Sequence, residues 1–235
     1  MTAQINDRFR YRNANYSLAG ISKGELFDIS VFDLSPTMAS TACWRGYRAV
    51  FAISQSRLVL DSLSVNLIRE DKQHFPGGHR AKRRLNLPVI RGGDDYQRYR
   101  REQGPVINGI MPSFSRAPDG VASTKEFLAK IHLFNNHYEG LNCHLEYSGG
   151  VLLAEGFIWT LYVHMGFHPA WKYENVIELI FESGILKEEY DRSNEMAEIR
   201  EMIVDSRNDR DSGTIPTKDE MRRFVERAFD RTYRL

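Results

Sequence analysis

Residues 44–67 read WRGYRAVFAISQSRLVLDSLSVNL, and this stretch decides the predicted fold. Apolar and polar side chains alternate on both sides of the polar triplet at 54–56, which is typical of two antiparallel strands joined by a tight turn. The alternation changes parity between Leu60 and Leu63, and this predicts a bulge near Asp61. A β-hairpin with one bulged strand is therefore the first element that we predict.

Further strands flank this hairpin on both sides. Phe9 and Tyr11 alternate with arginines just before a turn-forming Asn-Ala-Asn run. Residues 141–147 alternate as another strand, and residues 176–187 predict a second hairpin around the Glu-Ser-Gly turn at 182–184. The strong strand signals are hairpin signals, which favours a mostly antiparallel sheet.

Helical spacing is concentrated in the second half of the chain. Helices are predicted at residues 123–134, 157–165 and 193–203. The best helical pattern covers residues 217–233, where a capping box precedes a regular apolar stripe. Phe224 and Phe229 belong to that stripe and are predicted to be buried.

Length and composition agree with one packed domain. A chain of 235 residues with 42% hydrophobic residues buries enough apolar surface to fold without disulfides or metals. We predict an α+β fold in which a mostly antiparallel sheet, beginning with the N-terminal hairpin region, is packed by helices from the C-terminal half. Residues 1–235 form this single domain, with a basic excursion at 72–101 and the C-terminal helix at 217–233.

The basic excursion at residues 72–101 is the strongest compositional signal. It holds nine basic and two acidic side chains, a net charge of +7 in a chain whose total is +1. Thirty residues of weak periodicity are unusual inside a compact domain and are typical of a functional or irregular segment. Interleaved arginine and tyrosine suit both base stacking and protein-interface hot spots. The predicted partner-binding residues are Arg80, Lys82, Arg83, Arg84, Tyr96, Arg98, Tyr99, Arg100 and Arg101.

Three acidic partners fit this segment. One is an acidic protein surface and another is nucleic acid, although the signatures of the common RNA-binding modules and of a phosphate-binding loop are missing. The third is the chain itself, because residues 174–230 hold 16 acidic and nine basic side chains. Charge alone does not separate these alternatives.

A catalytic alternative centres on Cys43, Trp44 and Arg45. A neighbouring cation can lower the pKa of a thiol and make it nucleophilic, and Arg45 lies two residues from Cys43. No histidine is close in sequence, so the packing interpretation of Cys43 is favoured. His164 and His168 have a spacing that can hold zinc on a helix, but Gly166 interrupts that helix and no third ligand is evident. We predict neither a metal nor a cofactor.

The remaining features concern compartment and class. The polar N-terminus lacks the apolar core of a secretory signal, and the most apolar run is far shorter than the roughly 20 residues that span a bilayer. With two cysteines, a soluble cytoplasmic protein without membrane contact is expected. We predict an interaction or regulatory protein, of the antitoxin or immunity kind for example, rather than an enzyme. The alternative is a small transferase or hydrolase with a site around Cys43, Trp44 and Arg45, joined by His164 or His168.

Overall fold

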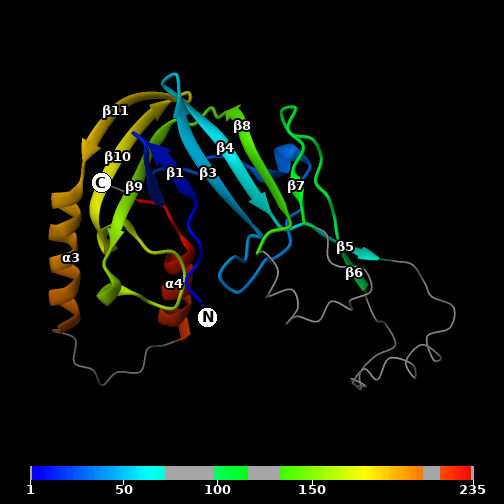
Figure 1. The fold of residues 1–235 in the computed structure, drawn as a ribbon. Helices are drawn as coiled ribbons and strands as arrows, with labels where there is room; N and C mark the ends of the chain where they lie inside the picture. Colours follow the sequence, from blue (N-terminus) through cyan, green and yellow to red (C-terminus); the bar gives the residue numbers. More distant parts are fainter. Residues whose placement is uncertain (1, 72–97, 116–132, 209–217, 234–235) are drawn as a thin grey trace, which may run out of the picture.

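The computed structural model describes residues 2–71, 98–115, 133–208 and 218–233. Its main body is one sheet of nine strands (Figure 1). The strands are β1 (Arg8–Tyr11), β2 (Ala14–Ile21), β3 (Tyr47–Ser54), β4 (Arg57–Val65), β7 (Ser113–Phe114), β8 (Asn136–His144), β9 (Gly149–Phe157), β10 (Tyr173–Glu182) and β11 (Ile185–Asp191). Their order is β11-β10-β9-β2-β1-β3-β4-β8-β7. Neighbours pair antiparallel except for the parallel pair β1–β3. The predicted mostly antiparallel sheet is confirmed.

Both predicted hairpins are present. The β3–β4 turn holds Gln55 and Ser56 at φ 49° and 64°, and the β10–β11 turn holds Ser183 and Gly184 at φ 47° and 74°. Two successive left-handed residues match the right-handed twist of the flanking strands. The register of β3 against β4 shifts at Asp61, where the parity change predicts a bulge.

The sheet curls so that its edge strand β11 pairs with β4 in the interior of the strand order. The tips of the two hairpins come together at the top of the view in Figure 1, where Ile185 of β11 pairs with Arg57 of β4. The Leu58 amide donates to the Gly184 carbonyl at 2.7 Å, and the Leu186 amide donates to the Ser56 carbonyl at 2.9 Å. This contact closes one end of the curled sheet around the main core.

The core fills the inner face of the curl. Its largest fully buried side chains include Phe9, Phe51, Leu58, Leu60, Leu63, Tyr138, Leu141, Leu153, Leu179 and Phe181. These residues come from strands across the whole sheet, so no short segment contains the core by itself. Burial of this apolar surface is the main force that holds the sheet in its curled form.

The helices occupy the periphery of a fold that strands dominate. Helix α3 (Ser193–Asn208) begins at the predicted Ser193, and its buried Met196 joins a small cluster with Tyr173 and Val176 of β10. Helix α4 (Lys218–Phe229) follows near the C-terminus. The predicted cover of the sheet by helices is not confirmed by this arrangement. Among the described helices, none is long and apolar enough to span a membrane.

The helix predicted at residues 157–165 is wrong. Strand β9 continues to Phe157, and only a 3-10 turn, η2 (Trp159–Leu161), follows before Tyr162 returns to an extended conformation. Two members of the predicted stripe, Phe157 and Tyr162, belong instead to a cluster of rings, in which Trp159 and Tyr162 both pack against Phe157. Of the helix predicted at residues 123–134, residues 123–132 lie outside the described residues.

The end of the chain returns to the sheet after α4. Phe229 stacks on Trp44 with ring centroids 4.9 Å apart and is only partly buried, whereas the side chain of Phe224 lies outside the description. The Tyr233 hydroxyl then donates to the Glu178 carboxylate at 2.6 Å. The absence of a side chain at Gly150 makes room for this ring, because a Cβ at that position would lie only 2.0 Å from the Tyr233 hydroxyl oxygen.

Candidate interaction surface

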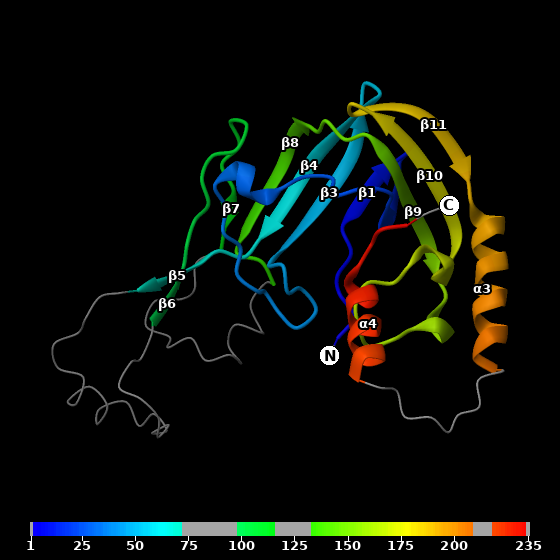
Figure 2. The same ribbon diagram turned by 180° about the vertical axis from the view of Figure 1, so that it is seen from behind.

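The described end of the basic segment forms a small two-stranded ribbon. Strand β6 (Arg98–Arg101) pairs antiparallel with β5 (Ile68–Asp71), and we call this pair the basic ribbon. It is separate from the nine-stranded sheet and lies beside β7 at the edge of the molecule (Figures 1 and 2). Its register sets Arg69 opposite Arg100 and Asp71 opposite Arg98. Two arginine positions therefore face each other directly across the ribbon.

Two asparagines attach the basic ribbon to the main sheet. Asn135 pairs with the backbone of Leu67, donating to its carbonyl at 2.7 Å and accepting from its amide at 2.9 Å. Asn136 accepts from the Gly104 amide and donates to the Glu102 carbonyl, both at 2.8 Å. Both asparagines are fully buried. We call this pair the asparagine base; it binds the chain just before β5 and just after β6.

Arg101 is an anchor within this region. Its Nη1 donates to the Ser115 carbonyl at 3.2 Å, and burial lowers the pKa of the guanidinium. Its Nε is buried and has no hydrogen-bond partner among the described residues. Part of this predicted partner-binding side chain is therefore used to hold the ribbon in place.

The remaining predicted partner-binding residues fall into two groups. Arg98, Tyr99 and Arg100 have described backbone positions in β6. Outside the described residues lie Arg80, Lys82, Arg83, Arg84 and Tyr96. Their role stays a prediction.

The residues of the catalytic alternative are built into packing. Cys43 is 1% exposed, and its thiol donates to the Tyr47 carbonyl at 3.3 Å. Burial raises the pKa of Cys43, and this effect outweighs the opposing charge of Arg45. A thiol in this environment remains protonated and poorly nucleophilic at neutral pH.

Arg45 is held by a buried carboxylate that the sequence did not single out. Asp7 is 2% exposed and accepts from both Arg45 and Arg231. Burial acts to raise the pKa of Asp7, but the two guanidinium charges outweigh it and lower the pKa. Both cations also lie over the Phe167 ring, at 5.8 Å for Arg45 and 4.9 Å for Arg231. This cluster joins the N-terminus, the segment before β3 and the C-terminal end of the chain.

The two histidines lie in different surroundings. His164 is exposed and packs edge-on against Tyr162, whereas His168 is 8% exposed between Phe157 and Tyr162. Burial and the nearby Lys172 lower the pKa of His168 to about 4. Within the described residues, no group of three or more potential metal ligands comes together.

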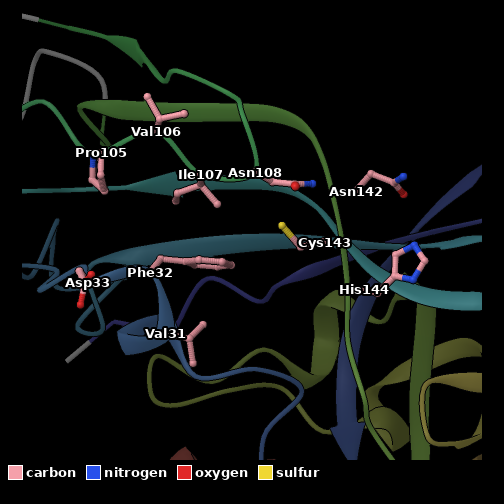
Figure 3. Close-up of a pocket in the computed structure, with 10 residues that line it drawn as sticks. All are labelled: Val31, Phe32, Asp33, Pro105, Val106, Ile107, Asn108, Asn142, Cys143 and His144. Atoms are coloured by element: carbon pink, nitrogen blue, oxygen red, sulfur yellow. The ribbon is translucent and has the colours of Figure 1, made fainter.

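A groove lies beside the asparagine base and was not predicted. Its volume is about 700 Å³, and it runs between the 3-10 turn η1 (Ile29–Phe32), residues 105–108 and the end of β8. Figure 3 shows Phe32 on one wall and Ile107 on the other, with Cys143 toward the end where Asn142 and His144 lie. The one signal in the sequence was Asn108-Gly109, a typical tight-turn dipeptide.

No known protein family matches the chain, and neither a curated protein nor a solved structure shows significant similarity to it.

Proposed function

We propose that the protein is a cytoplasmic interaction protein, without catalytic activity of its own, that binds an acidic partner through its arginine- and tyrosine-rich segment at residues 72–101. A regulatory role in which it neutralises that partner, as antitoxin and immunity proteins do, suits such a design. The cytoplasmic assignment is supported by the two cysteines, Cys43 and Cys143, which are both free.

The observation that carries the proposal is the register of the basic ribbon. Arg69 and Arg100 occupy directly opposing positions, and like charges across an antiparallel pair destabilise it. An anionic partner bound at this pair removes that repulsion. We therefore expect an acidic ligand to stabilise the ribbon.

The attachment of the ribbon supports a binding role. Asn135 and Asn136 place four hydrogen bonds on the backbone at its base. Because these bonds already fix the base of the ribbon before a partner binds, the ribbon loses less conformational entropy on binding.

An external partner is favoured over the acidic C-terminal half. The basic ribbon and α3 lie at opposite ends of the molecule in both views (Figures 1 and 2). Acidic side chains of the C-terminal half already have basic neighbours close by. Glu178 and Glu195 both bind Arg192, and Glu226 binds Arg222.

The test uses anionic probes of defined chemistry. Fluorescence anisotropy would measure the binding of a decaglutamate peptide and of a 20-base-pair DNA duplex between 50 and 300 mM salt. We expect the binding to weaken steeply with salt, and Arg69→Ala with Arg100→Ala to reduce the affinity about tenfold or more. Arg8→Ala with Arg223→Ala, which removes two exposed arginines elsewhere, is the matched control. Equal effects of the two double variants, or no binding of either probe at 50 mM salt, contradict the proposal.

A further inference from the structure

The groove beside the asparagine base combines an apolar middle with polar ends. Val31 and Phe32 form one wall, and Val106 and Ile107 form the other. Figure 3 places Asp33 at one end and the pair Asn142 and His144 at the other. A cavity of about 700 Å³ lies within the size range of sites that receive a small ligand or a side chain of a partner.

The 105–110 wall is held by hydrogen bonds within its turn and to β8. Ile107 and Ile110 exchange backbone hydrogen bonds at 3.0 and 2.8 Å across a turn in which Asn108 and Gly109 have φ 47° and 78°. The Asn108 side chain also donates to the Leu141 carbonyl at 2.6 Å, which ties the turn to β8. The groove is therefore formed before any ligand arrives, and preformed sites lose little entropy on binding.

Aliphatic side chains around the groove face solvent. Val31 is 68% exposed and Val106 is 53% exposed, and Met111, just beyond the turn, is 59% exposed. Apolar side chains that stay exposed to water contribute little burial free energy to the folded chain. Clustered exposure of this kind is typical of a surface that a partner covers.

The chain leads directly from the basic ribbon into one wall of the groove. Only three residues lie between Arg101 at the end of β6 and Pro105 in the groove wall, a chain length of at most ~14 Å. The connection is fixed at both Gly104 and Pro105, because the Gly104 amide donates to Asn136 and the Tyr138 hydroxyl donates to the Pro105 carbonyl at 2.9 Å. The arginine positions of β6 and the apolar groove are thus held close together along the chain.

We propose that the groove receives a large apolar side chain from an acidic polypeptide segment, whose carboxylates bind the basic ribbon. This inference rests on the proposed function and selects protein over nucleic acid as the partner. An apolar socket beside arginines matches a protein hot spot with its charged rim. A nucleic acid strand presents phosphates and bases, and it gains little from the aliphatic walls of Val31 and Val106. The charge of Asp33 at the groove mouth opposes phosphates and carboxylates alike, but Asp33 can accept a hydrogen bond from a peptide amide, which a nucleic acid backbone does not offer.

The experiment compares two acidic nonapeptides, made of aspartate and glutamate, that differ only in a central leucine or serine. Anisotropy at 100 mM salt gives their affinities, and a 20-base-pair DNA duplex serves as the third probe. We expect the leucine peptide to bind roughly tenfold more tightly than the serine peptide, because one buried leucine supplies a gain of that order. We also expect only the leucine peptide to slow the alkylation of Cys143, whose thiol lies in the groove.

Substitutions that leave the net charge unchanged separate the contribution of the groove to peptide affinity from the contribution of the arginines. Val31→Ser with Val106→Ser is expected to lower the affinity for the leucine peptide to that for the serine peptide, and to leave the serine peptide unchanged. Val163→Ser, at another exposed valine far along the chain, is expected to have no effect. Equal affinity of the two peptides for the native protein overturns the inference while leaving the proposed function intact. Tighter binding of the duplex, unaffected by the valine substitutions, replaces the protein partner with nucleic acid. If no probe binds, both the inference and the proposed function are wrong.

Discussion

Asp7 and Arg45 form a two-point ion pair inside the protein, in which the Oδ2–Nη1 and Oδ1–Nη2 distances are both 2.6 Å. The same carboxylate accepts from the Ala49 amide at 2.7 Å and from Arg231 at 3.0 Å. One buried side chain thus connects the first strand region, β3 and the C-terminal end.

Asp7→Asn is expected to lower the free energy of unfolding by about 3–5 kcal/mol, because it leaves two partly buried guanidinium groups without their counter-charge. Urea denaturation at neutral pH measures this difference. Asp219→Asn, at an exposed position in α4, is the matched control and is expected to cost less than about 1 kcal/mol. A similar small effect at both positions means that the ion pair contributes little to stability.

The ion pair also predicts a stability profile at acid pH. The pKa of Asp7 is lowered from its ordinary value of 3.8, so the carboxylate stabilises the fold above that value, and the stabilisation is lost as the pH falls through the lower pKa of the folded protein. Below about pH 4 we therefore expect the native protein to lose stability more steeply than Asp7→Asn. Parallel profiles for the two proteins argue against this assignment.

His168 predicts a second, separate pH dependence. Its pKa falls from 6.5 to about 4 on folding, so the unfolded chain binds a proton between these values and the folded protein does not. Stability therefore decreases as the pH falls from 6.5 to 4, by on the order of 1–3 kcal/mol. His168→Gln is expected to flatten this part of the profile, and His144→Gln, at an exposed site, is expected to leave it unchanged. If both variants keep the native slope, His168 is not the group that titrates.

The two cysteines are expected to react in a fixed order. Cys143 is partly exposed and Cys43 is 1% exposed, so a thiol reagent at neutral pH should modify Cys143 first while the protein is folded. Mass spectrometry after short exposure measures the order, and unfolding in urea should make the two rates similar. Cys43→Ser is expected to lower stability modestly and to leave probe binding intact. Rapid, selective modification of Cys43 supports the catalytic alternative instead.

Asn135→Ala tests the attachment of the basic ribbon. It removes three hydrogen bonds, two with the Leu67 backbone and one from Asn136. The buried Leu67 amide is left unpaired, whereas the Leu67 carbonyl keeps its bond from the Glu102 amide, and we expect a cost of roughly 1–3 kcal/mol. Because the ribbon loses its fixed position, we also expect weaker binding of anionic probes under conditions where the variant is folded. Asn175→Ala, at an exposed position of β10, is the control for both measurements. Unchanged probe affinity in folded Asn135→Ala shows that ribbon placement does not matter for binding.

The sequence alone determined the two hairpins, the bulge at Asp61 and the start of α3 at Ser193, because these features depend on local periodicity and on turn and capping chemistry. It also determined the excess of positive charge at residues 72–101. Helical spacing failed at residues 157–165, where two of the apolar positions, Phe157 and Tyr162, serve a cluster of rings at the end of a strand. A helix and a packed loop can share one pattern of apolar residues, and only the surrounding structure distinguishes them.

The tertiary structure alone decided which polar residues act together. Asp7 meets Arg231 across 224 residues of chain, and Asn135 meets Leu67 across 68. The groove likewise joins η1, the 105–108 segment and the end of β8. A single sequence carries no periodic signal for such contacts, because each depends on how the sheet curls and on which strands become neighbours. Local patterns therefore predicted elements and charge, whereas packing over long distances along the chain determined the attachment of the ribbon and the groove beside it.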